Sequence, residues 1–439
     1  MMNDKLKRRD FIKTSGTLAT GAIVGSSIVG SAYAAGSDII KIALIGCGGR
    51  GTGAVFDAYA SGQTVQLVAM ADVFQENLDK TYKTIKAKFG NKIDVPESRR
   101  YVGLEAYKSA IADADVVILT TPPGFRPDHF QEAVKAGKHV FMEKPVAVDV
   151  PGIRKVLDAA KVAKEKKLNV VVGFQRRFQT NYREAIKRIH DGAIGDVVSG
   201  QVYWNSGGVW VRPRKPSQSE MEYQINNWYY FNWLCGDHIV EQHVHNMDVA
   251  NWIKQKYPVS IQGTGSRAHR IGEDYGEIYD NFAVEMTYED GTVVYSQCRH
   301  FEGISNRVDE TFQATAGRAF LSASNQAILW DKNGREIYKH KPKGDPNPYQ
   351  QEHVELFEAI AKGDYKFDTA EYGAYSTLTG IIGRAACYTG KVIKWEEGLK
   401  SNLDLMPERL AWDATPRPVK GEDGLYPAAI PGIDVEKYI

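Results

Sequence analysis

The sequence predicts an α/β protein with two main domains: an N-terminal doubly wound parallel sheet, and a C-terminal α/β domain with a mainly antiparallel open sheet. Two patterns support this prediction. Between residues 39 and 178, short apolar runs alternate with amphipathic segments, which is typical of a parallel sheet covered by helices. After residue 178, strand-like runs follow one another with few long helices between them, which favours antiparallel pairing. A length of 439 residues is sufficient for two domains.

Composition and charge are those of an ordinary globular protein, with 43% hydrophobic and 25% charged residues. The net charge of +1 gives no basic excess of the kind that binds nucleic acid or an anionic membrane. The four cysteines show no CxxC spacing and are too few for a disulfide framework.

The first 34 residues form a separate segment. Arg8 and Arg9 are followed by Phe11, Ile12 and Lys13, and then by a weakly apolar stretch rich in Gly and Ser that ends in Ala-x-Ala at position 34. This segment resembles a twin-arginine export signal. We therefore expect cleavage after residue 34 and a periplasmic protein that is not attached to the membrane. A general secretory signal is an alternative. The shortness and polarity of the stretch argue against a membrane anchor.

A glycine-rich turn follows the first apolar run, residues 39–45, and precedes a helix. In a dinucleotide fingerprint, the first glycine makes a tight turn, the second lets the backbone approach a pyrophosphate, and the third lets helix pack on strand. The second apolar run ends at Asp72, where a carboxylate binds the ribose 2′-hydroxyl and repels a 2′-phosphate. We expect NAD as the cofactor rather than NADP, bound by Gly46, Gly48, Gly49, Arg50, Gly51 and Asp72.

The alternation of strand and helix continues to residue 178 and predicts an open parallel sheet of six strands. Ligands bind such a sheet beyond the carboxyl ends of its strands. Three of the strand-like runs, each with the turn that follows it, span residues 113–123, 138–145 and 168–178. From these ends we expect Thr121, Pro122, Glu143 and Lys144 to contact the cofactor, and Gln175 and Arg176 to contact the substrate.

Four motifs in this order give the sequence a specific resemblance: the glycine fingerprint, a Thr-Pro turn, "AGKHVFMEKP" and "VGFQRRF". Together they resemble the glucose–fructose oxidoreductase and inositol dehydrogenase family (Gfo/Idh/MocA). The resemblance implies a Rossmann domain at 35–170, a substrate and oligomerisation domain at 171–405, and a homodimer or homotetramer. The Pro-rich end, 406–439, is expected to be an arm lying on another surface, with a disordered end as the alternative.

The second half contains strand-like runs at 195–205, 259–269, 280–300 and 309–331, with a hairpin turn at "EDG", 289–291. Helices near 350–362 and 371–388 should pack around this sheet. Eight aromatic residues lie from position 204 to position 233. Such density is typical of a core or a subunit interface, but neighbouring polar loops favour sugar stacking by at least one ring, for which we select Trp228.

The segment "GDHIVEQHVHNMD", residues 236–248, is rich in ionisable groups. If it forms one helix, Asp237, His238, Glu241, His245 and Asp248 fall on one face. That face could be solvated surface, an acid/base site, or a metal site formed by His238, Glu241 and His245.

The resemblance implies catalytic roles in this segment. The family's lysine of the EKP motif matches Lys144, and its histidine on the first helix of the second domain matches His245. The carboxylate four residues earlier is Glu241, where the family commonly has Asp. We assign His245 as proton acceptor, because imidazole titrates near neutral pH, and Lys144 as the group that polarises the same oxygen, although these two roles are exchangeable.

Glu241 would then orient His245 or hold a neighbouring hydroxyl. Asp237, His238 and Asp248 are expected to contact or support the substrate. No catalytic metal is implied.

The predicted function is a periplasmic NAD(P)-dependent oxidoreductase that acts on a secondary hydroxyl of a sugar, glycoside or polyol. The cofactor should stay tightly bound, because little free NAD is available outside the cytoplasm. An NAD-dependent glycoside hydrolase that oxidises carbon 3 transiently is the alternative, since the same residue types serve both reactions. A sensor without catalysis is a third possibility, against which the presence of both Lys144 and His245 counts.

Overall fold

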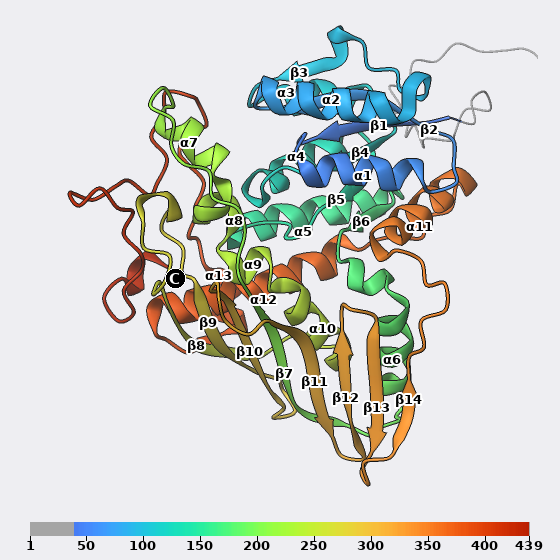
Figure 1. The fold of residues 1–439 in the computed structure, drawn as a ribbon, viewed down its shortest axis with the longest axis vertical. Helices are drawn as coiled ribbons and strands as arrows, with labels where there is room; N and C mark the ends of the chain where they lie inside the picture. Colours follow the sequence, from blue (N-terminus) through green and yellow to red (C-terminus); the bar gives the residue numbers. More distant parts are fainter. Residues whose placement is uncertain (1–38, 439) are drawn as a thin grey trace, which may run out of the picture.

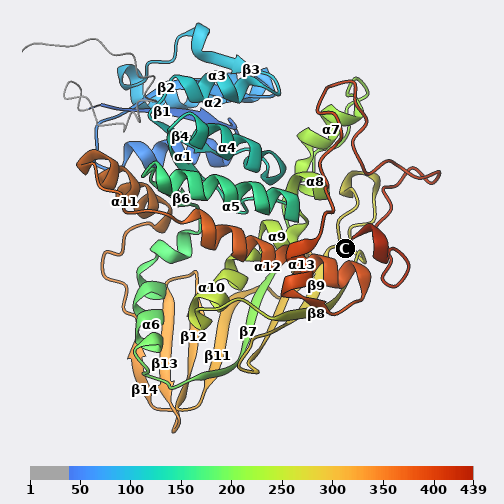
Figure 2. The ribbon, with the colours of Figure 1, turned by 180° about the vertical axis from the view of Figure 1, so that it is seen from behind.

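The computed structural model describes residues 39–438, and the predicted export signal lies outside these residues. Figure 1 shows a parallel sheet with its helices above a second, broad sheet, with helix α12 (Ala370–Thr389) running between them. Figure 2 shows the same two layers from behind. Within the described residues, no helix is both long enough and apolar enough to cross a membrane.

The first sheet has six parallel strands in the order β3-β2-β1-β4-β5-β6, as expected for a doubly wound fold. The sequence pattern did not single out the short edge strand β3. The strands are β1 (Ile40–Ile45), β2 (Val65–Asp72), β3 (Arg100–Val102), β4 (Val116–Leu119), β5 (His139–Met142) and β6 (Val170–Val172). The central strands are almost entirely buried, because helices cover both faces.

The helices that cover this sheet follow its strands in the chain. They are α1 (Gly49–Tyr59), α2 (Gln75–Phe89), α3 (Ala106–Ala112), α4 (Arg126–Lys135) and α5 (Val150–Glu165). Helix α5 begins where the Asp149 carboxylate accepts the Gly152 N–H at 2.8 Å. A late helix, α11 (Pro348–Lys362), joins them, because its Leu356 and Phe357 pack in one core with strand β1.

The second sheet has nine strands in the order β14-β13-β12-β11-β7-β10-β9-β8-β15. All its pairs are antiparallel except β7 with β10, which confirms the mainly antiparallel sheet. The predicted turn at 289–291 joins β9 to β10, with Gly291 at φ +81°. The strands are β7 (Val197–Ser206), β8 (Ser260–Ser266), β9 (Asn281–Thr287), β10 (Val293–His300), β11 (Arg307–Ala314), β12 (Gly317–Ser322), β13 (Gln326–Asp331), β14 (Glu336–Lys339) and β15 (Ile393–Lys394).

The two sheets share a continuous hydrophobic core. Helix α12 connects them: residues along it pack with α5 on one side and with strands β8 and β9 on the other (Figures 1 and 2). The remaining helices are α6 (Thr180–His190), α7 (Glu220–Asn226), α8 (Asn232–Cys235), α9 (His238–Glu241), α10 (Val244–Lys254) and α13 (Trp395–Lys400).

The histidine-rich segment is not one helix, so the predicted single polar face is wrong. It forms two short helices, α9 and α10, separated at Gln242 and His243. The break has a tertiary cause, because the His243 ring bonds the Ser296 hydroxyl on β10 at 2.7 Å. At the start of the segment, Asp237 caps the N-terminus of α9 and has a positive φ of +70°.

The C-terminal segment from residue 401 to 438 lies against its own chain, mostly without helix or strand. Its start is fixed where the Leu405 N–H donates to the Asp149 carboxylate at 2.9 Å. Farther on, Tyr426 is almost fully buried and packs edge-to-face on Phe231.

Candidate active site

The glycine turn after β1 has the geometry that its spacing predicts. Gly46 has φ +95°, and a Cβ on it would lie 2.7 Å from the backbone of Thr120. A Cβ on Gly51 would lie 2.2 Å from the Gly46 carbonyl oxygen. By contrast, Gly48 and Gly49 face open space. Two glycines therefore allow close backbone packing, while the other two leave room for a ligand at the start of helix α1.

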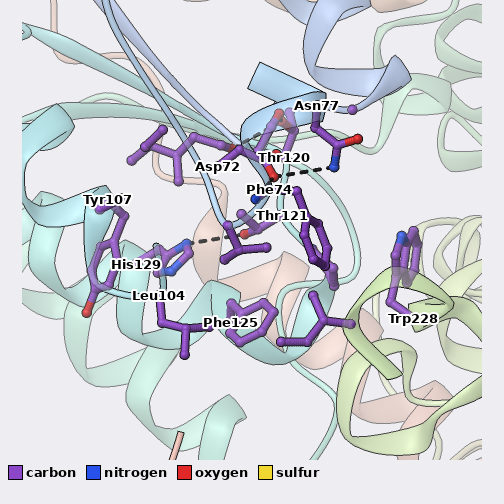
Figure 3. A pocket seen from close by; sticks show the side chains of 18 of the residues that line it. Asp72, Phe74, Asn77, Leu104, Tyr107, Thr120, Thr121, Phe125, His129 and Trp228 are labelled. Atoms are coloured by element: carbon purple, nitrogen blue, oxygen red, sulfur yellow. Dashed lines mark hydrogen bonds between the residues drawn. The ribbon is translucent and has the colours of Figure 1, made fainter. Parts of the chain in front are cut away.

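A pocket with about 760 Å³ of empty space lies beyond the carboxyl ends of β1, β2 and β4. Figure 3 shows Asp72, Phe74 and Asn77 on one side of it, and Tyr107, His129 and Phe125 around the rest. Its apolar rings and its position at the glycine turn fit a dinucleotide. The lining residues that the sequence did not indicate include Phe74, Asn77, Leu104, Tyr107, Thr120, Phe125, His129, Arg212 and Ile225.

Asp72 stands at the end of β2 and lines this pocket. One carboxylate oxygen accepts the Cys47 N–H at 2.6 Å, and the other accepts the Phe74 N–H at 2.8 Å. Burial raises the pKa of Asp72, and these backbone hydrogen bonds oppose that change. The carboxylate is thus fixed next to the glycine turn, where a ribose hydroxyl would donate to it.

Arg50 and Glu143, both expected to bind the cofactor, contact each other instead, because the Arg50 Nε donates to the Glu143 carboxylate. The Arg50 guanidinium also lies 3.4 Å from Asp57 and 3.6 Å from the buried Glu352 of helix α11. Neither Arg50 nor Glu143 lines the pocket. Their contacts indicate that they join α1, β5 and α11.

Thr121 and Pro122 line the pocket, as expected from the end of β4. The Thr121 hydroxyl lies 3.2 Å from Nδ1 of His129. Burial lowers the pKa of His129 to about 3, so this ring is neutral. The buried Arg126 donates to the carbonyl oxygens of both Thr121 and Pro145, which ties the Thr-Pro turn to the loop that carries Lys144.

Lys144 and Glu241 meet between the two domains. The Lys144 ammonium donates to the Glu241 carbonyl oxygen at 2.6 Å and lies 3.3 Å from its carboxylate. Both side chains are only 10% exposed. The second carboxylate oxygen of Glu241 is buried without a hydrogen-bond partner. The observed partner of Glu241 is therefore Lys144 rather than His245.

His245 is the second residue of helix α10 and is 4% exposed. Its ring lies between Phe174, edge-on at 5.9 Å, and Trp204, nearly parallel at 6.1 Å. Its Nδ1 is buried and has no hydrogen-bond partner. Burial, followed by the charges of Lys144 and Arg176, lowers the pKa of His245 well below the usual range. The imidazole is therefore neutral at pH 7, the form in which one of its ring nitrogens can accept a proton.

Two residues expected to contact substrate have structural contacts instead. Both Asp237 oxygens are in use: one bonds the His238 backbone and ring, and the other accepts the Tyr279 N–H at 2.8 Å and the Tyr388 hydroxyl. Arg176 is buried and pairs with Glu310. Both side chains are thus held by the protein's own groups, although the buried Nε of Arg176 has no hydrogen-bond partner among residues 39–438. Their contact with substrate stays a prediction.

Three other residues expected to contact substrate, Gln175, His238 and Trp228, have different surroundings. Gln175 donates to the Tyr349 hydroxyl at 3.1 Å, but its carbonyl oxygen is buried without a partner. His238 is buried and stacks on His300 at 4.3 Å. Trp228 lines the dinucleotide pocket (Figure 3), whereas Lys144 does not.

Several buried polar atoms near Glu241 have no partner in the described part of the chain: the Tyr229 hydroxyl and the Nε2 atoms of His238 and His300. The Tyr229 ring stacks on His300 at 5.8 Å, and the Glu241 charge helps burial to raise the pKa of Tyr229. Unpartnered buried donors and acceptors are costly unless a ligand or water satisfies them. Tyr229 and His300 carry no motif, so the sequence alone did not select them.

Among residues 39–438, no three His, Cys, Asp or Glu side chains are arranged to hold a metal ion. The metal interpretation of His238, Glu241 and His245 depended on one continuous helix, which the structure does not contain.

Comparison with known proteins supports the assignment from geometry. Residues 40–174 match the model of the oxidoreductase family with an NAD-binding Rossmann fold, and residues 182–315 match the GFO/IDH/MocA C-terminal domain. Inositol 2-dehydrogenase of Rhizobium meliloti (strain 1021) is 25% identical over 288 residues, which are 65% of this chain and 76% of that protein. A glycosyl hydrolase family 109 protein of Shewanella baltica (strain OS185) is 24% identical over 244 residues. That match spans 51% of this chain and about half (50%) of that relative.

Two solved structures share the fold. Aldose-aldose oxidoreductase from Caulobacter crescentus, in complex with glycerol, has a TM-score of 0.62 and 22% identity, covering 81% of this chain and 99% of that one. Levoglucosan dehydrogenase, in complex with NADH and levoglucosan, has a TM-score of 0.65 and 16% identity over the same shares. The two family models together match more than half of the sequence. The chain therefore belongs to the GFO/IDH/MocA family of NAD-binding oxidoreductases.

Proposed function

We propose that this protein is an exported oxidoreductase that uses bound NAD(H) to oxidise or reduce a secondary hydroxyl of a sugar, glycoside or polyol. The observation that carries the proposal is the pairing of Lys144 with Glu241 beside a buried, neutral His245. Of two similar proteins, one is named an inositol 2-dehydrogenase and the other a levoglucosan dehydrogenase. Their names agree with a polyhydroxylated substrate.

Residues of this chain give the pocket the features that a nicotinamide dinucleotide requires. Gly48 and Gly49 leave open space at the start of α1, and Asp72 presents a carboxylate at the end of β2. When bound, the nicotinamide ring supplies the hydride acceptor for oxidation of an alcohol and the hydride donor for the reverse reaction. We propose NAD over NADP, because Asp72 would repel a 2′-phosphate.

Side chains of the protein would accept the proton of the reacting hydroxyl and bind its oxygen. His245 accepts the hydroxyl proton on a ring nitrogen as the alcohol becomes a ketone, and returns it in the reverse direction. The Lys144 ammonium binds the same oxygen and stabilises negative charge that develops on it. Glu241 positions Lys144, and its second carboxylate oxygen accepts a hydrogen bond from a neighbouring hydroxyl of the substrate.

The twin-arginine pattern at Arg8 and Arg9 supports export of the folded protein with its cofactor bound. Because free NAD is scarce outside the cytoplasm, the cofactor would be reoxidised in place by a second substrate. A homodimer or homotetramer is the expected assembly, which light scattering after gel filtration would measure.

The test uses mature protein purified with its bound nucleotide. Single turnover with a sugar, myo-inositol or an aryl glycoside should produce a keto product and NADH absorbance, and then stop until an acceptor sugar is added. Product formed in proportion to the acceptor supports the proposal. Absence of any absorbance change across all three substrate classes argues against it.

A redox-assisted glycoside hydrolase is the second candidate, supported by the match to glycosyl hydrolase family 109 proteins. In that reaction, a ketone at carbon 3 acidifies the C–H at carbon 2, elimination releases the aglycone, and water adds before the ketone is reduced again. Turnover of an aryl glycoside in deuterated water separates the two. Many turnovers without acceptor, with free aglycone and deuterium at carbon 2, would overturn the dehydrogenase proposal.

A further inference from the structure

The dinucleotide pocket has a wall that does not come from the nucleotide domain. Arg212, Ile225 and Trp228 line it together with Gly46 and Asp72. These three residues belong to the segment between β7 and α8, residues 207–231, which we name the covering segment. Figure 3 shows Trp228 across the pocket from Tyr107 and His129.

The covering segment is held in place by its own hydrogen bonds. A capping box at Ser219 and Glu222 begins helix α7. The Asn227 side chain accepts the Arg212 N–H at 2.9 Å and donates to the Asp274 carbonyl oxygen at 2.8 Å. The Tyr230 hydroxyl donates to the carbonyl oxygen of Trp210 at 3.0 Å. The wall is therefore a folded structure, able to hold side chains at defined positions.

The C-terminal segment covers the same end of the pocket. Leu405, Met406, Leu410 and Trp412 pack in one hydrophobic cluster with pocket residues of the nucleotide domain and with Trp228. The Trp412 ring lies 5.9 Å from that of Phe74, which lines the pocket. The covering segment thus lines the pocket, and the C-terminal segment packs against lining residues at the end of β2.

Arg212 presents a half-buried positive charge at the pocket. Its guanidinium donates to the Asn226 carbonyl oxygen at 2.9 Å and lies 4.3 Å from the Trp210 ring centroid. No carboxylate in the described residues lies within ion-pair distance of it, although Asp72 and Glu76 attract it from farther away. Partial burial of an unpaired arginine is costly, and a phosphate is the group that best matches its planar donors.

We propose that the covering segment is part of the cofactor site, with the Arg212 guanidinium pairing with a phosphate of the dinucleotide and the Trp228 ring packing on its adenosine half. Release of the cofactor then requires the covering segment to move away from the C-terminal segment. This device retains the cofactor between turnovers. It depends on the dinucleotide pocket and on no feature of the sugar substrate.

The phosphate has two possible sources, the diphosphate that NAD and NADP share and the 2′-phosphate of NADP alone. Binding of NADH, NADPH and adenosine is measured by calorimetry to the apo-protein, for the wild type and for Arg212→Gln. If Arg212 pairs with the diphosphate, the substitution weakens both dinucleotides at least tenfold. If it pairs with the 2′-phosphate, only NADPH is weakened, and this outcome would contradict a role of Arg212 in retaining NADH. Adenosine should change by less than twofold in either case.

Retention is measured as the dissociation rate of bound NADH chased with excess NAD, from the loss of energy transfer between tryptophan and the nicotinamide. Arg212→Gln and Trp228→Ala should each release NADH at least tenfold faster. Lys215→Gln, which removes an exposed cation of the same segment, is the matched control and should match the wild type.

Circular dichroism and thermal unfolding establish that each variant is folded. Should either of these variants fail to fold, the milder Arg212→Lys and Trp228→Leu replace it, with the same expected direction. Folded variants that bind both dinucleotides and release NADH within twofold of the wild type would overturn the proposal. Because no sugar enters either measurement, this outcome is independent of the proposed reaction.

Discussion

The ammonium of Lys144 donates to the main-chain carbonyl oxygen of Glu241 at 2.6 Å, across the boundary between the two domains. This carbonyl is available because the helix breaks there. In a continuous helix, the N–H of His245 would occupy it, but that N–H turns to the Gln242 carbonyl oxygen, at 3.4 Å. The break between α9 and α10 thus supplies the acceptor that holds the lysine.

Lys144→Met removes the ammonium and keeps the length of the side chain. We expect kcat/KM to fall by about 10²–10⁴, the range for loss of a positioned polar catalyst. NADH affinity should change less than threefold, because Lys144 does not line the dinucleotide pocket. Steady-state kinetics and nucleotide titration measure the two effects. Lys155→Met, at an exposed ion pair with Asp128, is the control. A variant that retains near-native turnover would remove Lys144 from the mechanism.

Glu241→Gln should be milder than loss of the lysine. The main-chain acceptor at 2.6 Å survives the substitution, and only the weaker carboxylate contact at 3.3 Å is lost. We expect about a tenfold fall in kcat, the scale of one charge-assisted hydrogen bond. Activity equal to that of Lys144→Met would instead mean that the carboxylate itself takes part in proton transfer.

His245 predicts the pH dependence of the reaction. Burial and the nearby charges lower its pKa below the usual 6.5, so the imidazole stays neutral as pH falls through 6.5. The acid limb of kcat/KM for oxidation should therefore lie below pH 6.5, and the rate should be flat from there to neutral pH. His245→Asn should lower turnover by about 10²–10⁴, and the residual rate should no longer show this limb. A limb above pH 6.5, or one that survives in the variant, would assign the proton to another group.

Local patterns predicted the nucleotide site well, because a tight turn demands glycine at defined positions. At Gly46 and Gly51 a Cβ would lie only 2.7 Å and 2.2 Å from neighbouring backbone atoms, and Asp72 lies at the end of β2 as its spacing indicated. Lys144 and Glu241 meet because each ends an element that faces the domain boundary. Such features depend on a few neighbouring residues, and the sequence contains that information directly.

Burial and distant contacts were not predictable in the same way. Asp237 and Arg176 are residue types that often contact ligands. In the structure, however, Asp237 accepts a hydrogen bond from Tyr388, and Arg176 pairs with Glu310, both far away in sequence. The break at His243 depends on Ser296. Arg212 and Trp228 reach the pocket only because the covering segment folds back over it. Each of these outcomes is decided by packing between segments that no local periodicity connects.

Asp72→Ala tests the cofactor preference. The substitution removes the carboxylate that would accept ribose hydroxyls and repel a 2′-phosphate. NAD affinity should fall about tenfold, while NADP affinity should be unchanged or rise, so that the ratio between them narrows. Titration of the apo-protein with both nucleotides measures this ratio, with Asp79→Ala on helix α2 as the control. An unchanged ratio would place Asp72 away from the ribose.

The ion pair between Arg177 and Asp248 indicates that Asp248 has a structural role and not a catalytic one. Asp248 is 1% exposed, and both its oxygens accept from the Arg177 guanidinium at 2.8 Å. The Ser376 hydroxyl also donates to it, at 2.6 Å. Although Asp248 follows His245 by three residues, these contacts direct its carboxylate to the core and leave it no part in proton transfer.

Asp248→Asn should therefore lower the free energy of unfolding by about 3–5 kcal/mol, because it leaves a largely buried arginine without its counter-charge. Activity per folded molecule should stay within about threefold of the wild type, which is under 1 kcal/mol of transition-state stabilisation. Denaturant unfolding and active-site-normalised kinetics measure the two quantities. Asp191→Asn breaks the exposed pair with Lys187, whose side chains are 72% and 59% exposed for lysine and aspartate, and should cost less than about 1 kcal/mol. A stable but inactive Asp248→Asn protein would reverse the assignment and place Asp248 in the catalytic machinery.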